Sequence, residues 1–274
     1  MKTKNKIIGV DGNWVLHRAF NTTPSDIRDP GAAICSKFVS MISKDALAVK
    51  ATKMLVAFDG ARIFRYKIYP DYKGNRVKSD GIGPYDYLER LTAFLGECGI
   101  SYLQDHRYEA DDVLCSLAAN SPDDLLFVST RDKDAYQYVT QNVVLYDSSA
   151  PVPMRTSVGE IKNKMGIPPS LCLDYQTLLG DKIDNIPQLH TPVATKEGLM
   201  AYGSLKNWLA NDRVIRKKLK GKGDQLKLNR KLVRLVPTIE AAVAKKIKWN
   251  SEPHMPRAYV GWKDFCNPKS KGLF

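Results

Sequence analysis

The segment with the clearest capacity for chemistry is residues 108–118, YEADDVLCSLA. Three carboxylates, Glu109, Asp111 and Asp112, stand at the start of an apolar pattern that is typical of a helix, with no Lys or Arg among them or in the turn that follows. Residues three apart share one helix face, so Glu109 and Asp112 are expected to lie side by side. An acidic first turn, which the helix dipole stabilises by under about 1 kcal/mol per group, is one interpretation. It accounts for one or two of the acids but not for the whole set.

Other acids stand directly after short apolar runs. Asp11 ends the run KIIGVDG, Asp59 ends KMLVAFDG, and Asp132 and Asp134 close DLLFVSTRDKD. Unbroken apolar runs of this length are typical of strands buried on both faces of a parallel sheet. Ligands bind at the carboxyl ends of such strands. We therefore expect these four acids at the same edge of the sheet.

Carboxylates gathered at one edge must be neutralised. Two like charges 4 Å apart repel by roughly 4 kcal/mol at an effective dielectric near 20, so either some acids are protonated or a cation binds. Asp181 and Asp184, in GDKIDNIP, are again three residues apart. Oxygen ligands without His or Cys select hard cations such as Mg²⁺ or Mn²⁺. Two such ions about 4 Å apart form a common arrangement for in-line displacement at phosphorus.

The elements that must hold these acids alternate along the first half of the chain. Helical patterns lie between the apolar runs, which predicts an α/β layered sheet. We expect strands over 6–12, 53–60, 99–104, 124–134 and 142–147, and helices over 31–50, 84–98 and 110–120. From residue 158 the pattern is helical, through 196–210 and 226–248. The predicted organisation is an α/β domain over 1–155, a helical region over 156–250 and an irregular tail over 251–274.

Composition restricts the partner and the compartment. The 274 residues carry a net charge of +13, from 42 basic and 29 acidic side chains. This surplus favours a polyanionic partner, most simply nucleic acid, over an ordinary basic protein. No apolar run approaches the roughly 18 to 20 residues of a membrane span, and the start lacks a signal-peptide pattern. The five cysteines form no CxxC pair, which favours reduced thiols in the cytoplasm over disulfides or a zinc site.

The connection over 60–84 is longer than most connections between a strand and a helix. This arch segment is basic and carries Tyr66, Tyr69 and Tyr72. Cations can meet phosphates and rings can stack on bases, so we expect an arch that contacts nucleic acid. Core packing is the alternative interpretation for Tyr66 and Tyr69.

Six motifs in series resemble one known family. They are IIGVDGNWVLHRAF, AFDG, YKGNR, YEADDVLCSLA, STRDKD and LLGDKIDNIP, from about residue 7 to 187. They are similar to motifs of the 5′-nucleases, which comprise bacteriophage and bacterial 5′–3′ exonucleases and flap endonucleases, including the exonuclease domain of bacterial DNA polymerase I. The resemblance implies a PIN-like α/β fold, with a mostly parallel sheet and a C-terminal DNA-binding region like a helix-three-turn-helix.

The resemblance also implies roles for particular residues. The ligands of the ion nearest the scissile phosphate would be Asp11, Asp59, Glu109 and Asp111. The second ion would be held by Asp112, Asp132, Asp134, Asp181 and Asp184, partly through waters. Lys73 and Arg76, from the YKxxR motif, would stabilise charge on the phosphate oxygens. The expected contacts to DNA are Arg18, Arg62, Arg65, Tyr72, Lys73, Arg76, Lys196, Arg216, Lys217 and Lys218.

The sequence departs from the family after DNIP. The family continues with a glycine-rich hairpin whose carbonyls hold a K⁺ ion against duplex phosphate, whereas residues 188–201 here read QLHTPVATKEGLMA. Pro192 has no amide N–H to donate. The departure counts against a K⁺ site, and we expect duplex binding through Lys196 and the basic run over 213–223. A run that serves only solubility is the alternative.

Our first hypothesis is therefore a two-metal 5′-nuclease acting on DNA at or near 5′ ends, flaps, nicks or junctions, or on RNA in hybrids. A metal-bound water would attack phosphorus in line and leave 5′-phosphate products. We expect a monomer that does not bind membranes. One alternative is a PIN-like single-strand ribonuclease, which needs neither GDKIDNIP nor a basic arch. The other is a DNA-binding relative with weak catalysis. The balance of exonuclease and flap endonuclease behaviour stays open.

Overall fold

A mostly parallel six-stranded sheet forms the centre of the computed structural model, within the residues that it describes: 5–24, 26–60, 63–76, 81–149, 152–236 and 239. The strand order is β3-β2-β1-β4-β5-β6, and β6 alone pairs antiparallel. The strands are β1 (Lys6–Asp11), β2 (Lys53–Phe58), β3 (Tyr102–Gln104), β4 (Leu125–Ser129), β5 (Val143–Asp147) and β6 (Met154–Thr156). The predicted α/β architecture and its five parallel strands are confirmed.

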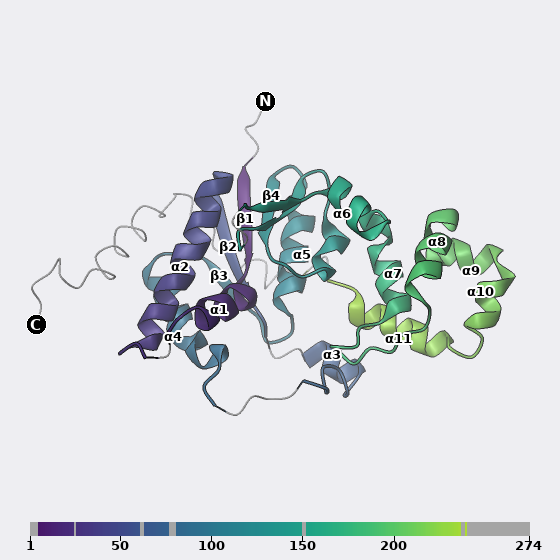
Figure 1. Ribbon diagram of the computed structural model, residues 1–274, viewed down its shortest axis with the longest axis horizontal. Coiled ribbons are helices and arrows are strands. Elements are labelled where there is room, and N and C mark those ends of the chain that lie inside the picture. Colours follow the sequence, from purple (N-terminus) through teal and green to yellow (C-terminus); the bar gives the residue numbers. More distant parts are fainter. Residues whose placement is uncertain are drawn as a thin grey trace, which may run out of the picture.

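Helices cover both faces of this sheet. On one side lie α1 (Gly12–Asn21), α2 (Pro30–Val49) and α4 (Leu88–Glu97), and on the other lies α5 (Ala110–Asn120) (Figure 1). Successive strand residues point to opposite faces. Ile8 accordingly packs with Phe38 of α2, while its neighbour Ile7 packs with Leu114 of α5. This double burial explains why the strands are unbroken apolar runs.

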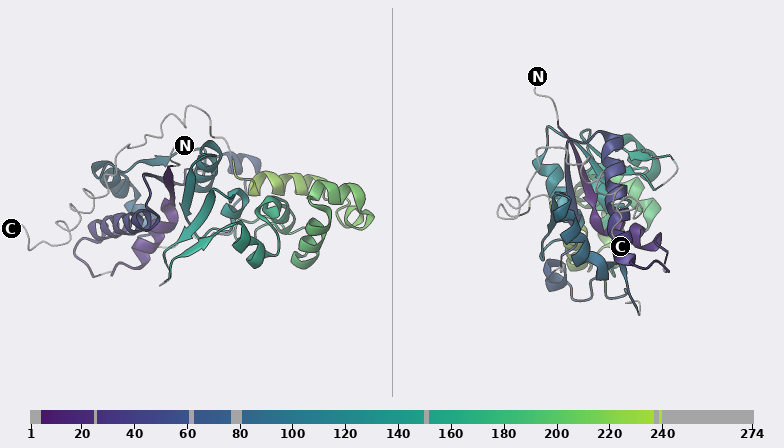
Figure 2. Two further views of the ribbon diagram at one scale, coloured as in Figure 1. Left: turned by 90° about the horizontal axis from the view of Figure 1, so that it is seen from above. Right: turned by 90° about the vertical axis from the view of Figure 1, so that its left-hand side faces the viewer.

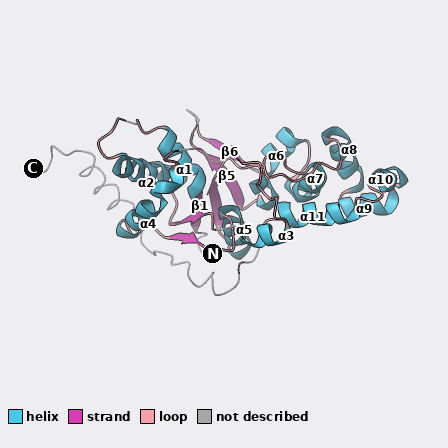
Figure 3. Ribbon diagram, turned by 90° about the horizontal axis from the view of Figure 1, so that it is seen from below, coloured by secondary structure: helices cyan, strands magenta, loops and turns pink. Residues whose placement is uncertain are grey.

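A helical region extends the molecule away from α2 and α4, as two perpendicular views show (Figures 1 and 2). Its helices are α6 (Val158–Met165), α7 (Cys172–Leu179), α8 (Pro192–Tyr202), α9 (Leu205–Asn211), α10 (Arg213–Lys218) and α11 (Gly223–Val233). Figure 3 shows α11 running back from α9 and α10 toward α3 (Ile63–Ile68).

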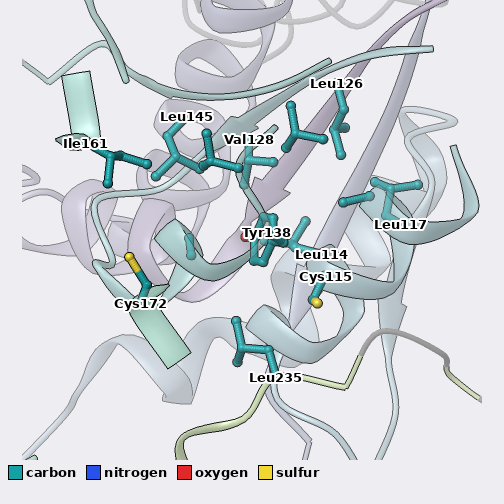
Figure 4. Packing of buried hydrophobic residues seen from close by; sticks show 14 of the residues in the cluster. Leu114, Cys115, Leu117, Leu126, Val128, Tyr138, Leu145, Ile161, Cys172 and Leu235 are labelled. Atoms are coloured by element: carbon teal, nitrogen blue, oxygen red, sulfur yellow. The ribbon is translucent and has the colours of Figure 1, made fainter. Parts of the chain in front are cut away.

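The helical region shares its apolar core with the sheet. Ile161 of α6 and Cys172 of α7 belong to the same buried cluster as Leu145 of β5 and Leu114 of α5 (Figure 4). The division near residue 155 into two domains stays a prediction.

Several elements differ from the sequence-based prediction. The three-residue β6 is too short for a pattern to reveal it. Helix α1 was not predicted and begins at Gly12, inside the run predicted as a strand, where Asp11 accepts the Trp14 amide and so caps the helix. The arch segment contains α3, and the helix expected over 226–248 ends at Val233. Most of 237–274, including the expected tail, lies outside the described residues. Within the described ranges, no helix has the length and apolar character needed to cross a membrane.

Close packing of α8 on α9 depends on a glycine. A Cβ built at Gly198 would lie 2.1 Å from Cζ2 of the buried Trp208 indole. We predict that Gly198→Ala lowers the free energy of unfolding by about 1 to 3 kcal/mol, because the indole must shift. Chemical denaturation measures this change.

Gly96→Ala, in α4, is the matched control, because its Cβ would meet nothing within 4 Å. It should leave stability unchanged or raise it by up to about 1 kcal/mol, as helix propensity favours Ala. Equal stability of the Gly198→Ala and wild-type proteins would contradict the packing described.

Candidate active site

Four of the predicted acids lie at the carboxyl edge of neighbouring strands. Asp11 is the last residue of β1, Asp59 follows β2, and Asp132 and Asp134 follow β4. β1 pairs with both β2 and β4, so these three strand ends are adjacent. Helix α5 brings Asp111 to the same place, where it lines one cavity with Asp132 and Asp134. Burial raises the pKa of Asp111, and the charges of Asp132 and Asp11 raise it further.

Asp11 is buried and held by two donors. Its Oδ1 accepts the Trp14 amide at 3.0 Å, and its Oδ2 accepts the Thr130 hydroxyl at 3.0 Å. Burial, partly opposed by these donors and reinforced by Asp59 and Asp132, raises the pKa of Asp11 to about 7. Folding thus places a carboxyl group where it keeps a proton near neutral pH.

The Thr130 hydroxyl joins two of the acids. While it donates to Asp11, it accepts the backbone amide of Asp132 at 3.1 Å. Oδ1 of Asp132 then accepts the amide of Asp134 at 2.8 Å. One hydroxyl therefore fixes both the acid of β1 and the loop that carries the acids after β4.

Three further carboxyl groups share the environment of Asp11. Burial raises the pKa values of Asp111, Asp132 and Asp134, that of Asp134 to about 8, and neighbouring acids raise them further. The side-chain amide of Gln176, on α7, donates to Asp134. Oδ1 of Asp111 is buried and has no hydrogen-bond partner. An unpaired buried oxygen among acids is a place where a cation would be stabilised.

Basic residues of the arch segment close over Glu109 and Asp184. Nζ of Lys73 lies 2.8 Å from Glu109 Oε1 and 3.6 Å from Asp184 Oδ2. Arg76 pairs with Asp184 at 2.7 Å, and the Tyr72 hydroxyl lies 3.2 Å from Glu109 and 3.1 Å from Asp184. The segment that carries the predicted catalytic bases is therefore joined to the acids of GDKIDNIP.

The joint between the two segments also involves the backbone. The Lys73 amide donates to the Asp184 carbonyl at 3.0 Å, and the Asn185 side chain donates to the Asp71 carbonyl at 3.0 Å. Lys73 has φ of 57°, in the left-handed region that non-glycine residues rarely adopt. The contacts on both sides of Lys73 hold it in this conformation.

These groups line a cavity of about 600 Å³. Its polar lining includes Lys73, Arg76, Glu109, Asp111, Asp132, Asp134, Asp181 and Asp184. Asp11 and Asp59 are not among the lining residues, but the charges of both act on the lining residue Asp111. Asp59 itself is held by the Ala110 amide, which donates to its Oδ1 at 2.9 Å.

The donor set fits a hard divalent cation, although it is arranged around protein cations here. Among the described residues, no three His, Cys, Asp or Glu side chains are gathered closely enough to hold a metal ion as they stand. Lys73 and Arg76 instead neutralise Glu109 and Asp184. Oxygen-only donors and the unpaired Asp111 oxygen suit a hard divalent cation.

Asp112 does not take its predicted place among the ligands. Its carboxylate is fully buried and forms two bonds with Arg65, at 2.6 and 2.9 Å. It also accepts the amides of Glu109 and Val236. The absence of nearby bases in the sequence was misleading, because Arg65 comes from a segment 47 residues away.

Arg65 and Tyr72 do not have the exposure that their predicted DNA contacts require. The Arg65 side chain is 1% exposed and Tyr72 is 3% exposed, so neither can meet a phosphate or a base in this conformation. Arg18 is half-buried, with its guanidinium 4.6 Å from the Trp14 ring centroid. Arg62 lies outside the described residues.

The bases expected to bind duplex lie in the helical region. Arg216, Lys217 and Lys218 are exposed on α10, at the end of the molecule farthest from α2 (Figure 1). Lys196 lies with Nζ 5.8 Å from the ring centroid of Tyr175, a cavity-lining residue. In place of a glycine hairpin, α8 begins at Pro192 after Thr191.

Sequence reasoning did not predict that neutral residues organise the acids, although it named Tyr72 as a contact to DNA. Thr130, Gln176 and the Tyr72 hydroxyl all contact predicted ligands. Nothing in their residue types marks such a role. The position of Thr130, two residues before Asp132 at a strand end, is the one signal that could have suggested it.

Comparison with known proteins identifies a family to which most of the α/β part of the chain is similar. Residues 6–166 match the family model described as "5′-3′ exonuclease, N-terminal resolvase-like domain". DNA polymerase I of Lactococcus lactis subsp. cremoris (strain MG1363) is 32% identical over 231 residues, which cover 77% of this chain and 26% of that protein. The chain therefore spans about a quarter of the length of this curated relative.

Solved structures show the same fold. A bacteriophage T5 flap endonuclease in complex with DNA and metal ions has a TM-score of 0.69 and 17% identity, over 96% of this chain and 100% of its own. T5 5′-exonuclease with bound divalent metal ions (zinc) has a TM-score of 0.68 and 17% identity, over 96% and 99%. The similarity extends beyond the family match to the helical region.

We predict that Thr130→Val weakens Mn²⁺ binding by about 10- to 100-fold, the usual effect of removing a group that orients ligands. Valine keeps the shape of threonine but neither donates to Asp11 nor accepts from Asp132. Isothermal titration calorimetry measures the affinity. Thr130→Ser retains the hydroxyl and should stay close to wild type; equal losses in both variants would show that packing, not the hydroxyl, matters.

We also predict that the metal-free protein loses stability as the pH rises. The pKa values of Asp11 and Asp134 are raised from 3.8 to about 7 and about 8, so the folded state binds more protons than the unfolded state across this window. The free energy of unfolding therefore falls as the pH rises from the ordinary pKa of 3.8 toward the raised values of about 7 and about 8.

Thermal unfolding in EDTA, from about pH 5 to about pH 8, measures this dependence. Asp134→Asn should flatten the slope, because the amide does not titrate. A melting temperature that rises through this window in wild-type protein would contradict the raised pKa values.

Proposed function

The chain belongs to the 5′-3′ exonuclease family, and from this premise we propose that it is a divalent-metal-dependent 5′-nuclease that hydrolyses DNA phosphodiesters at or near 5′ ends. The observation that carries the proposal is a cavity bordered by Lys73 and Arg76 and lined by acids from the end of β4, the start of α5 and the 181–184 loop. The acids of β1 and β2 lie at the adjacent strand ends. Family membership alone would not establish that the catalytic apparatus is retained. The acids and bases gathered at the cavity support a working catalytic site.

Divalent ions are the cofactor that this donor set supports. The T5 relatives were solved with metal ions, zinc in one case. We propose Mg²⁺ or Mn²⁺, two ions, because the donors are carboxylate oxygens. Asp11, Asp59, Glu109 and Asp111 would hold the first, and Asp132, Asp134, Asp181 and Asp184 the second. Bound there, the ions would neutralise the phosphate and lower the pKa of an attacking water.

Lys73 and Arg76 change partners in this proposal. In the present structure they neutralise Glu109 and Asp184, the same carboxylates that would bind cations. Once divalent ions carry that role, the two bases are free to contact the phosphate and stabilise its charge in the transition state. The leaving group is the 3′-oxygen, so the products carry a 5′-phosphate.

DNA is the proposed substrate. The T5 flap endonuclease was solved with DNA, and the net charge of +13 favours a polyanion. The arch bases beside the carboxylates favour this function over a single-strand ribonuclease, which would not need the link between Lys73 and Asp184. Activity on RNA–DNA hybrids, a monomeric state and a cytoplasmic location stay predictions.

The decisive test is cleavage of nicked, flapped and single-stranded DNA with and without Mg²⁺. We predict products with 5′-phosphates in Mg²⁺ and none in EDTA. Asp132→Asn/Asp134→Asn should lower kcat by at least about 100-fold, since both acids would hold an ion. Labels at the 5′ end and within the flap separate exonuclease from endonuclease products.

Asp224→Asn is the matched control, because this acid is fully exposed on α11 and pairs only loosely with Lys227 at 3.4 Å. It should cleave like wild type. Undiminished cleavage in EDTA, or by the double variant, would rule out the proposed mechanism.

A further inference from the structure

Arg65 lies beside the cavity and uses all three of its guanidinium nitrogens in contacts with the protein. Its side chain is 1% exposed, and it belongs to α3, in the arch segment. A guanidinium has five N–H donors. Nε donates to the Leu232 carbonyl at 2.9 Å, and Nη2 donates to Asp112 Oδ1 at 2.9 Å and to the Arg234 carbonyl at 3.2 Å. Nη1 donates to Asp112 Oδ2 at 2.6 Å and lies 3.0 Å from Glu109 Oε2. Each donor nitrogen is thus occupied.

These contacts join three segments that are far apart in the sequence. Arg65 connects the arch segment to the start of α5, through the N-cap residue Glu109 and through Asp112 of the first turn, and to the carboxyl end of α11. The Leu232 carbonyl is one of the last carbonyls of α11, which have no partner within the helix, and a cation there is favourable. Asp112 completes the joint by accepting the Val236 amide at 3.0 Å.

The contacts of Arg65 include Glu109, one of the carboxylates that would hold a metal ion. Glu109 is 7% exposed and receives Arg65 on one oxygen and Lys73 on the other. If Lys73 leaves when ions bind, Arg65 is the base that still orients the carboxylate. Its planar fork sets both the position and the rotation of the groups it contacts, which a lysine ammonium cannot do.

We propose that Arg65 is a positioning residue: it orients Glu109 for metal binding and makes that orientation depend on the docked end of α11. The inference rests on the proposed nuclease function and deepens it. The helical region that would bind duplex then shares one side chain with the catalytic carboxylates, so its docking and the order of the metal site are linked.

Arg65→Lys is the first test variant, because it keeps the charge beside Asp112 but has a single nitrogen for five acceptor contacts. We expect Mn²⁺ affinity, measured by calorimetry, to fall by about 10- to 100-fold. On a flap substrate, kcat should fall by a similar factor, while KM changes by less than about threefold, because Arg65 is buried and touches no DNA.

Arg230→Lys is the matched control. Arg230 also links α11 to a neighbour, by its ion pair with Asp174 of α7, and it contacts none of the cavity acids. The same substitution there should leave Mn²⁺ affinity and kcat within about twofold of wild type. An equal loss in both variants would show that loosening α11 is sufficient and would overturn the role of Arg65 at Glu109.

A second variant covers a failure of Arg65→Lys to fold. Arg65→Gln/Asp112→Asn replaces the buried ion pair with two amides that can hydrogen-bond each other, so no buried charge is left unpaired. We expect this variant to fold, as shown by circular dichroism, and to bind Mn²⁺ at least about tenfold more weakly than wild type.

A folded Arg65 variant with wild-type Mn²⁺ affinity and kcat would overturn the proposal. Failure of the nuclease function is distinguishable. In that case the wild-type protein cleaves none of the DNA substrates, while the calorimetric comparison of wild type with Arg65→Lys still decides whether Arg65 orients Glu109.

Discussion

Mutual repulsion among carboxylates at one edge of a parallel sheet is the constraint that shapes this molecule. The fold brings Asp11, Asp111, Asp132 and Asp134 together, where loss of water around each carboxyl group raises its pKa and the charges of neighbouring acids raise it further. Such a cluster is tolerated only when protons, donors or cations offset its charge. All three are present. Some acids keep protons, the Thr130 hydroxyl and backbone amides donate to others, and the arch segment supplies bases.

The same constraint explains why distant segments meet at the cavity. Lys73 and Arg76 neutralise carboxylates on α5 and on the 181–184 loop, and Arg65 neutralises Asp112 and Glu109. Buried charges need partners with good geometry, because an unpaired one costs several kcal/mol. Ion pairs with the acids therefore hold the arch segment at the cavity. Arg65 links the carboxyl end of α11 to the same acids. In the proposed nuclease, this site would exchange protein cations and protons for divalent ions and a phosphate.

Sequence reasoning predicted the strands and the sheet edge at which the acids gather. It did not predict which protein groups offset the negative charge of these acids. Runs such as those ending at Asp11 and Asp59 identify strands, because burial on both faces requires unbroken apolar residues. Parallel pairing then places their ends together. The role of Asp112 could not be predicted, because its partner Arg65 is far along the chain and looked like a surface base. Thr130 was missed, and Tyr72 was assigned to DNA rather than to the acids, because the role of a hydroxyl group depends on what it contacts. The strand β6 was missed because it has three residues. The helix α1 was missed because it follows β1 without a connecting loop, with the last residue of the strand as its N-cap.

The central claim is that this edge exchanges protons and protein cations for hard divalent ions. Proton release on addition of Mg²⁺ to weakly buffered protein near neutral pH tests it most directly, with a pH indicator as readout. Asp11 and Asp134 hold protons there, since their pKa values are raised to about 7 and about 8, and they must lose them to bind a cation. We predict saturable proton release that Asp132→Asn/Asp134→Asn diminishes. Wild-type protein that releases no protons at any Mg²⁺ concentration would contradict the account.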